Sequence, residues 1–328
     1  MKIGVFCSGG DAPGMNACIR AIVRSAVSQG HEVVGIMRGY QGILDEAFYS
    51  TQDGNVQLMM RSVSGISMLG GTVLHSSRCP DFQTEEGMRR AAEILKKHHF
   101  DAIIPIGGNG TLSGAHEFRQ FWDGKIVGCP GTIDNDLCGT DYTIGFHTAV
   151  QTAVEAVDKL RDTAHSHDRM FIIELMGRHC GYITLYTAIA AGCEIACIPE
   201  KTLKTEEMIE KLHELKRAGK DSIIMAVAEG YLEGVLSLQK KLEAAGCPFP
   251  IRVVVLGHLL RGGAPVAEDR ILATLLGYHA VKAVLQGQTD VMAGITCNSP
   301  KLFPLEEVIK DHRQVPDYMV ELLKVVSK

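Results

Sequence analysis

The 328-residue sequence lacks two features that would assign it to common protein classes, a long apolar run and an excess of basic residues. A helix that crosses a membrane needs about 20 consecutive apolar residues, and no stretch approaches that length. The net charge of −5 argues against general nucleic-acid binding, because phosphate backbones select basic surfaces. The apolar run at the N-terminus leads directly into glycines and is too short for a secretory signal. We therefore expect a soluble, cytoplasmic protein with no nucleic-acid or membrane partner.

Close cysteine pairs and linker-like segments are also absent. The ten cysteines are scattered without a C-x-x-C pair, which disfavours zinc sites and redox-active dithiols. Reduced and mostly buried thiols are the expectation for such a chain. Repeats, low-complexity tracts and proline-rich linkers are missing as well, so no domain boundary is visible as a linker.

Apolar runs that favour strands alternate with helical patterns along most of the chain. Helices are predicted over 16–29, 91–98, 148–161 and 206–218, and strands over KIGVFC, EVVGI, AIIPI, KIVGCP, MFIIEL, IACIPE, SIIMAVAE and RVVVLGH. Apolar strands that are separated by helices are typical of parallel sheets covered on both faces. About ten strands in a chain of this length favour two α/β sheets. A (β/α)8 barrel is the alternative, although glycine loops after strands are more typical of open sheets.

Two glycine-rich loops follow predicted strands, SGGDAPGMN after the first and GGNGTLSG after AIIPI. Glycine lets the backbone approach a ligand closely, and the following helix start offers N–H groups to an anion. The spacing matches neither the dinucleotide fingerprint nor the P-loop, and Glu32 precedes the second strand instead of ending it. Each loop alone is a weak signal, because a structural turn is the alternative. Together, they predict a crevice for a polyphosphate.

Carboxylates and arginines also lie near predicted strand ends. Asp134 and Asp136 follow KIVGC, where one could take a proton from an attacking hydroxyl and the other could face a metal. An Asx-rich turn is the alternative. Arginines at strand ends suit phosphate, because the guanidinium binds two oxygens at once; these are Arg169, Arg178, Arg252 and Arg261. With Glu229 after another strand they would fit a phosphorylated sugar, whereas His258 alone is more typical of a structural histidine.

Four segments resemble, in order and spacing, those of the bacterial type of ATP-dependent 6-phosphofructokinase: SGGDAPGMN, PGTIDNDLCGTDYTIGF, MGRHCG and VLGHLLRGGAP. The resemblance spans Ile3 to about Leu285. It implies two similar Rossmann-like α/β domains, with mostly parallel sheets covered by helices and the active site in the cleft between them. The nucleotide-binding domain would comprise 1–145 and about 261–310, and the sugar-phosphate-binding domain about 146–260 and 311–328.

The resemblance also implies a reaction and an assembly. The γ-phosphoryl group of MgATP would pass to the 1-hydroxyl of fructose 6-phosphate, giving fructose 1,6-bisphosphate and ADP, the committed step of glycolysis. The active protein would be a homotetramer, and at least a dimer, because neighbouring subunits share each active site. A different kinase with a GGDGT-like loop, or a regulatory protein without turnover, is the alternative from another class.

Residue roles follow from the same resemblance. Asp134 matches the general base, and Thr132 and Arg178 match groups that stabilise the transferring phosphoryl. The nucleotide site would comprise Gly10, Tyr40, Arg78, Cys79, Gly108, Asn109, Gly110, Thr111 and Gly114. The sugar phosphate would contact Thr132, Asp134, Asp136, Arg169, Met176, Gly177, Arg178, Glu229, Arg252, His258 and Arg261. Of these, Arg169 and Arg252 match arginines that a neighbouring subunit lends.

Three positions bear on the metal and on the phosphoryl donor. Asn109 stands where the family has an aspartate for magnesium, and Asp136 is the other metal residue. Asparagine keeps an oxygen but loses a charge that magnesium prefers, so we expect an active enzyme with altered metal use; a catalytically weakened homologue is the alternative. Pyrophosphate-using relatives carry Asp and Lys where this chain has Gly110 and Gly131. The two glycines leave that space empty and favour ATP, with pyrophosphate or mixed use as the alternative.

An effector pocket is matched only in part. Its diphosphate- and metal-binding positions correspond to Arg20, Arg24, Arg161, Glu194 and Lys220. Arg61 lies one residue from the expected arginine, Gly65 replaces an acid, and one of two lysines is absent. We therefore expect ADP to act only weakly, and a structural role for the two arginines of the first helix is equally open.

Overall fold

The computed structural model describes residues 1–50, 54, 56–231 and 234–327. The chain separates into two compact units. The first comprises Met1–Ile133, Leu137–Thr148 and Arg261–His312, and the second comprises Asp134–Asp136, Ala149–Leu260 and Arg313–Lys328. A search of the described helices for one long and apolar enough to cross a membrane finds none.

The first unit is built on a mostly parallel sheet. Its strands run in the order β11 (Ser299–Pro304), β10 (Val291–Thr296), β4 (Lys125–Thr132), β3 (Ala102–Gly107), β1 (Lys2–Cys7) and β2 (Glu32–Gly35), and the short β5 (Ile144–Gly145) pairs with β4. Only β11 is antiparallel to its neighbour among these described strands. Crossover connections through helices account for the parallel pairing, as the alternating pattern of the sequence predicts.

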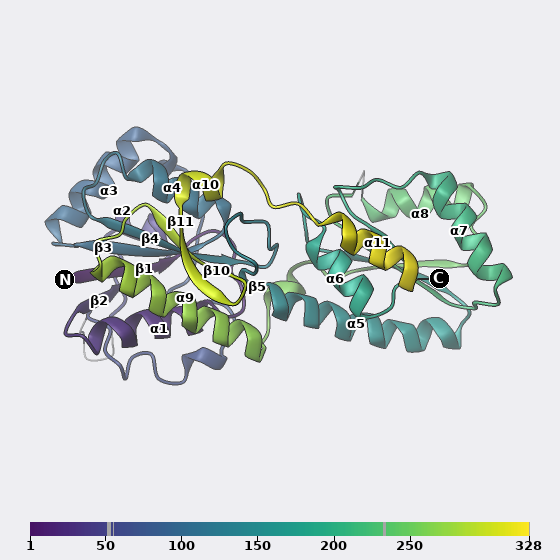
Figure 1. The fold of residues 1–328 in the computed structure, drawn as a ribbon, viewed down its shortest axis with the longest axis horizontal. Coiled ribbons are helices and arrows are strands. Elements are labelled where there is room, and N and C mark those ends of the chain that lie inside the picture. The colour runs from purple at the N-terminus through teal and green to yellow at the C-terminus, as the bar shows by residue number, and fades with distance from the viewer. Residues whose placement is uncertain (51–53, 55, 232–233, 328) are drawn as a thin grey trace. The chain divides into compact units, whose positions relative to one another are not determined.

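Helices cover both faces of this sheet (Figure 1). The helices α1 (Met15–Val27) and α9 (Ala267–Leu285) pack against each other on one face. The opposite face shares a core with α2 (Tyr40–Leu44), α3 (Glu85–Lys97), α4 (Asn109–Phe118) and α10 (Leu305–Ile309). Three short 3-10 turns lie in the connections between these elements: η1 (Ile66–Met68), η2 (Asp81–Gln83) and η3 (Gly257–Arg261).

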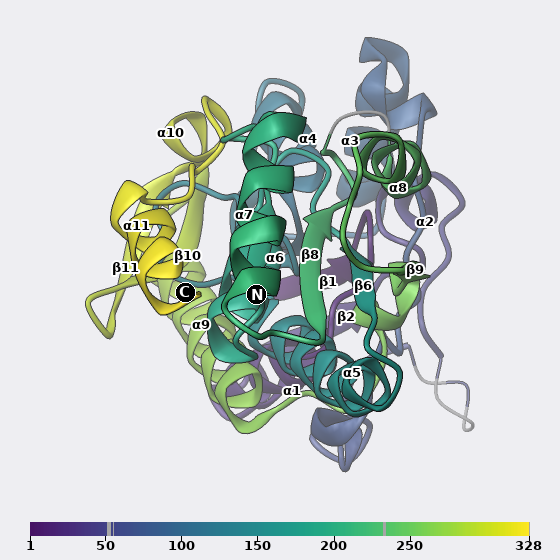
Figure 2. The same ribbon diagram turned by 90° about the vertical axis from the view of Figure 1, so that its right-hand side faces the viewer.

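The second unit has a smaller parallel sheet in the order β7 (Ile195–Cys197), β8 (Ile223–Ala228), β6 (Met170–Leu175) and β9 (Ile251–Val255). One face shares a core with α7 (Thr205–Arg217) and α8 (Val235–Ala244). The other face carries α6 (Tyr182–Ala190), on which α11 (Asp317–Val326) packs. The long α5 (Phe146–Ser166) lies on the side of the sheet opposite α8 (Figures 1 and 2).

The predicted fold class is confirmed, and the barrel alternative is wrong because the strands form two open sheets. The predicted strands are all present, although IACIPE forms only the three-residue β7, and α5 extends beyond both predicted ends. The strands β10 and β11 lie in the tail that the sequence left unassigned. All ten cysteines are free, as expected, and seven are buried; burial raises the pKa of Cys7, Cys193 and Cys197 to about 12.

Candidate active site

The two glycine loops lie side by side at the carboxyl ends of β1 and β3. The Ser8 N–H donates to the Ile106 carbonyl oxygen (3.1 Å), and the Thr111 hydroxyl donates to the Ser8 carbonyl oxygen (3.0 Å). A methyl group on Gly107 would lie 2.6 Å from that same Ser8 oxygen, so only glycine allows this close approach. Each loop leads into a helix, α1 or α4, whose first N–H groups favour an anion.

Tyr40 packs against the second glycine loop and is itself buried, with 4% of its surface exposed. Its hydroxyl donates to the Thr111 carbonyl oxygen (2.7 Å), and its ring stacks on Phe82 with 3.9 Å between centroids. Gly114 lies against both rings. Burial raises the pKa of the Tyr40 phenol, so the hydroxyl stays a neutral donor. The side chain predicted to line the nucleotide site thus packs beneath the start of α4.

Gly10 of the first loop lies under the guanidinium of Arg261. A methyl group on Gly10 would lie 3.0 Å from Arg261 Nη1 and 3.1 Å from Cζ. The structure therefore brings a predicted nucleotide residue and a predicted sugar-phosphate residue into contact within the first unit. Of the other predicted nucleotide residues, Cys79 is buried and Arg78 is exposed.

Gly110 and Gly131, predicted to leave empty space, differ in their surroundings. No heavy atom lies within 4 Å of a methyl group placed on Gly110, which is the exposed second residue of α4. A methyl group on Gly131 would instead lie 2.8 Å from Met15 Cε and 3.0 Å from Ile106 Cγ2. The prediction of empty space is therefore wrong at Gly131, because helix α1 and strand β3 fill it. Any steric argument about the donor rests on Gly110.

Asn109 is the first residue of α4, and its side-chain oxygen is a buried acceptor. The oxygen is inaccessible to solvent and accepts no hydrogen bond from the residues that the structure describes. A buried acceptor without a donor costs free energy, and a cation is one ligand that would satisfy it. No group of three or more His, Cys, Asp or Glu side chains that could hold a metal occurs in the described residues. A metal at Asn109 would therefore take most of its ligands from a bound phosphate or water.

The last residue of β4 and the segment after it alternate in burial. Thr132, Asp134 and Asp136 are half-buried, whereas each residue between or directly after them is at most 3% exposed. The three polar side chains are thus more accessible than their immediate neighbours, and of the Asp134 carboxylate the Oδ1 atom is itself buried. Gly108 of the second loop lies against Thr132, with 3.4 Å from an added methyl group to Thr132 Cβ. The Thr143 hydroxyl donates to the Thr132 carbonyl oxygen (2.7 Å), which fixes the end of β4.

In the second unit, the predicted loop MGRHCG follows β6 directly. Met176 and Gly177 are buried, and Arg178 is exposed. The backbone of Gly177 has a φ of 135°, which glycine tolerates at little cost. Any side chain on Gly230 would overlap the Arg178 carbonyl oxygen, so the loop after β8 presses against the loop that carries this arginine.

Glu229 and His258 lie at the same carboxyl edge of the sheet. Glu229 follows β8, where its N–H donates to the Leu175 carbonyl oxygen of β6 (2.8 Å), and its side chain is exposed. His258 lies in η3 after β9 and is also exposed. These residues and Arg178 therefore come from three neighbouring strands that end at one edge.

Arg169 and Arg252 lie at the opposite edge. Arg169 directly precedes β6, and Arg252 is the second residue of β9, paired with Phe171 at the start of β6. The six residues of β6 separate this edge from Arg178 by about 20 Å of strand. The four arginines thus do not gather around one phosphate within a chain, contrary to the prediction from strand ends alone.

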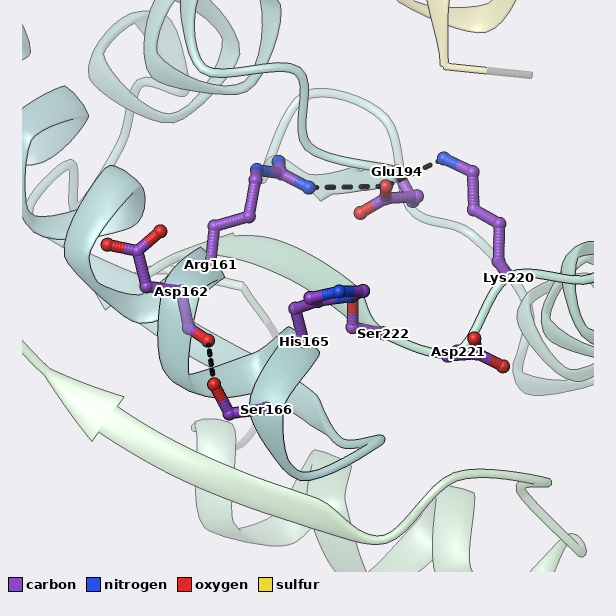
Figure 3. Close-up of a pocket in the computed structure, with 8 residues that line it drawn as sticks. All are labelled: Arg161, Asp162, His165, Ser166, Glu194, Lys220, Asp221 and Ser222. Atoms are coloured by element: carbon purple, nitrogen blue, oxygen red, sulfur yellow. Dashed lines mark hydrogen bonds and ion pairs between the residues drawn. The ribbon is translucent and has the colours of Figure 1, made fainter.

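A pocket of about 580 Å³ in the second unit contains three of the predicted effector residues. It is lined by Arg161, Asp162, His165, Ser166, Glu194, Lys220, Asp221 and Ser222 (Figure 3). Figure 3 shows the Glu194 carboxylate between the Arg161 guanidinium and the Lys220 ammonium, at 3.5 Å and 2.8 Å. The Ile224 N–H donates to the other oxygen of Glu194 (2.8 Å). This carboxylate therefore pairs with both cations that a diphosphate would need and offsets part of their charge.

The remaining predicted effector residues, Arg20 and Arg24, lie on α1 in the first unit. Arg24 Nε is buried without a hydrogen-bond partner among the described residues. The pocket itself is lined by two cationic and three anionic side chains, so its formal charge is 2 − 3 = −1 with a neutral histidine. A net negative lining does not favour the binding of an anion such as a diphosphate.

Sequence reasoning missed two side chains that support the loops. The Ser76 hydroxyl donates to the Gly9 carbonyl oxygen (2.7 Å), and Phe82 stacks on Tyr40. Neither residue belongs to a recognisable motif, and their only signal is that they lie close in sequence to Arg78 and Cys79.

Comparisons with known proteins match nearly the whole chain. A family model described as Phosphofructokinase matches residues 2–284. The ATP-dependent 6-phosphofructokinase 2 of Bacteroides thetaiotaomicron is 44% identical over 99% of this chain and 98% of its own length. The ATP-dependent 6-phosphofructokinase 1 of Thermus thermophilus is 44% identical over 99% of both. The solved phosphofructokinase of Saccharomyces cerevisiae superposes with a TM-score of 0.87 at 36% identity, over 94% of this chain and 45% of the yeast chain.

Proposed function

The chain belongs to the phosphofructokinase family, and from this premise we propose that it phosphorylates fructose 6-phosphate. The γ-phosphoryl group of ATP passes to the 1-hydroxyl, giving fructose 1,6-bisphosphate and ADP, the committed step of glycolysis and thus a cytoplasmic reaction. The observation that carries the proposal is the contact of the two glycine loops with each other and with Thr132. It occurs in a chain whose near full-length relatives are named as ATP-dependent enzymes.

We assign the nucleotide to the first unit, over 1–145 and 261–310, and the sugar phosphate mainly to the second. The loops offer the backbone N–H groups of two helix starts to the phosphates. Asp134 accepts the proton of the attacking hydroxyl, as a carboxylate within reach of it can. Arg178 and Thr132 stabilise the charge of the transferring phosphoryl. Contacts to the sugar phosphate come from Met176, Gly177, Glu229, His258 and Arg261.

ATP is the proposed donor because the space beside Gly110 is open. A nucleotide extends beyond the two phosphates that pyrophosphate shares with it, and it needs room where pyrophosphate-using relatives carry an aspartate. No atom lies within 4 Å of the Gly110 methyl position. Pyrophosphate does not extend into that space and is not hindered by its being open, so parallel assays with both donors distinguish them.

Magnesium is the proposed cofactor, held by Asn109, Asp136 and the phosphates. The buried and unpartnered Asn109 oxygen is a hard ligand of the type that magnesium prefers. When bound, the ion would neutralise phosphate charge. Because an amide carries no negative charge, we expect weaker magnesium binding than an aspartate would give.

A site composed from two copies of the chain explains Arg169 and Arg252. They lie at the amino edge of the sheet, whereas Arg178, Glu229 and His258 lie at its carboxyl edge. One sugar phosphate cannot contact both edges of one sheet. We therefore propose that each copy lends the two arginines to a neighbour in a homotetramer, and that a monomer is inactive.

The test is phosphorylation of fructose 6-phosphate by purified protein with MgATP and with magnesium pyrophosphate in parallel assays. We expect turnover with ATP. Asp134→Asn should lower kcat by about 1000-fold while fructose 6-phosphate still binds, as followed by calorimetry. Turnover mainly with pyrophosphate would overturn the donor assignment. Binding without turnover in the wild-type protein would mean that the chain has lost its chemistry at Asn109.

A further inference from the structure

Asp269, in the first turn of α9, is a buried carboxylate to which neither the family resemblance nor the proposed chemistry assigns a role. Its side chain has no exposed surface. One oxygen accepts from the Gly145 N–H (2.9 Å), and the other accepts from the Thr148 N–H (2.7 Å) and from the Thr148 hydroxyl. A buried charge persists only when such donors compensate for lost hydration. The positive N-terminal end of α5 adds to that compensation.

The contacts of Asp269 connect two helix starts. The Thr148 hydroxyl, besides donating to Asp269, accepts from the Val266 N–H (3.1 Å), and Val266 directly precedes α9. The first turn of α5 and the first turn of α9 are therefore held by one hydrogen-bonded group. Burial raises the pKa of the Asp269 carboxyl, while the three donors oppose that shift.

The strand that Asp269 holds, β5, supports the first glycine loop. A methyl group on Gly145 would lie 2.7 Å from Ala12 Cβ and 3.3 Å from Pro13 Cδ. A methyl group on Gly14 would lie 2.8 Å from Ile144 Cγ2 and 3.5 Å from the Asp269 carbonyl oxygen. The first distance is too short for a real contact, and the second is an ordinary van der Waals contact. Loop and strand thus pack without space for a side chain between them, and a shift of β5 moves the loop.

The same strand also holds Thr132. Gly145 pairs with Thr132 in a parallel register, and the Thr143 hydroxyl donates to the Thr132 carbonyl oxygen (2.7 Å). β5 therefore lies between the first glycine loop and the residue assigned to the transferring phosphoryl. Phosphoryl transfer depends mainly on positioning, and a 1 Å displacement can cost about 100-fold in rate.

We propose that Asp269 is a positioning residue for phosphoryl transfer, which fixes β5 and through it the first glycine loop and Thr132. The proposal rests on the proposed function for its catalytic readout. Asparagine at this position has the same shape but only one acceptor oxygen. Its amide group would face one of the N–H donors, so β5 or the start of α5 would shift.

The experiment compares Asp269→Asn with Asp290→Asn. Asp290 is a partly exposed carboxylate of the same unit, which pairs with His116 (2.9 Å) in the last turn of α4. We expect Asp269→Asn to lower kcat by about 30-fold and to raise the Kd for ATP about tenfold, with the KM for fructose 6-phosphate within threefold. Asp290→Asn should stay within twofold in all three quantities. A lower melting temperature of Asp269→Asn with kcat and Kd within threefold would show a role in stability alone and overturn the proposal.

A second pair of variants keeps the test decisive if Asp269→Asn does not fold. Thr148→Val removes the hydroxyl that donates to Asp269, and Thr148→Ser keeps it. We expect about a tenfold loss of kcat for the valine variant and recovery to within twofold for the serine variant; equal kcat in both would refute the proposal. If the wild-type protein does not phosphorylate fructose 6-phosphate, the proposed function fails. The Kd for ATP of the same variants then decides the role of Asp269.

Discussion

Gly110→Asp should have opposite effects on stability and on the use of ATP. The residue is exposed in the first turn of α4, where no acidic side chain occurs, and nothing lies within 4 Å of its methyl position. Aspartate has a higher helix propensity than glycine by a few tenths of a kcal/mol. Its charge interacts favourably with the helix N-terminus by about 0.3–1 kcal/mol. The free energy of unfolding should therefore stay equal or rise by about 1 kcal/mol.

The same carboxylate would occupy the space that we assign to the nucleotide. Two like charges 4 Å apart repel by about 1 kcal/mol in water and about 4 kcal/mol at an effective dielectric constant of 20. An exposed position lies between these limits, so we take about 1.4–2.8 kcal/mol. That energy corresponds to a 10- to 100-fold lower kcat/KM for ATP. Pyrophosphate does not extend into this space, and its kcat/KM should stay within threefold.

The assay measures kcat/KM for both donors together with urea unfolding, and two control variants separate charge from volume. Gly110→Ala adds only an uncharged methyl group to the space that we assign to ATP, so it should lower kcat/KM for ATP less than Gly110→Asp and leave pyrophosphate use unchanged. Gly110→Asn has the shape of aspartate without its charge and should lose less ATP activity than Gly110→Asp. An unchanged kcat/KM for ATP in Gly110→Asp would refute the reasoning, as would an equal loss for both donors.

Asn109→Asp restores a charge beside the proposed metal, and it should lower the magnesium concentration for half-maximal rate about tenfold, or 1.4 kcal/mol; an unchanged magnesium titration would contradict this. Mixing Arg252→Ala with Asp134→Asn, each nearly inactive, should restore about a quarter of the activity by random assortment, because one intact site can form from two different chains. No recovery after co-refolding would exclude a shared site. ADP should shift the half-saturating concentration of fructose 6-phosphate less than twofold, because Glu194 pairs with Arg161 and Lys220 and the pocket lining is net negative. A several-fold shift in a steady-state titration would show a working effector pocket.

The strands and the glycine loops could be predicted because their signals are local. An apolar run bounded by glycines indicates a buried strand and its end, whatever lies elsewhere in the chain. β10 and β11 carry a weaker signal: SPKLFP contains two prolines, which are tolerated on an edge strand but argue against a strand when the sequence alone is considered. Helix α9 buries one face but exposes the apolar Ile271 and Tyr278 on the other, so its sequence lacks the single apolar stripe that identifies a surface helix.

The arginines show why part of the site could not be predicted. A sequence shows that Arg169 and Arg252 lie next to strands, but a phosphate site depends on which edge of the sheet they reach. Arg252 pairs with the start of β6, and Arg169 directly precedes that strand, so both lie far from Arg178 at its end. This separation divides the four strand-end arginines into two groups. The prediction of a shared site came from the family resemblance, and the structure supplies a physical reason for it.

Three positions of the candidate site carry glycine for different physical reasons. Gly107 is required by the Ser8 carbonyl oxygen, and Gly131 is enclosed by Met15 and Ile106. Gly110 has neither constraint: its backbone is helical, its φ is not positive, and its methyl position is open. Alanine would stabilise the helix there by up to about 1 kcal/mol. Because the fold gives no reason for glycine at position 110, a ligand that needs the space is the best physical explanation for it.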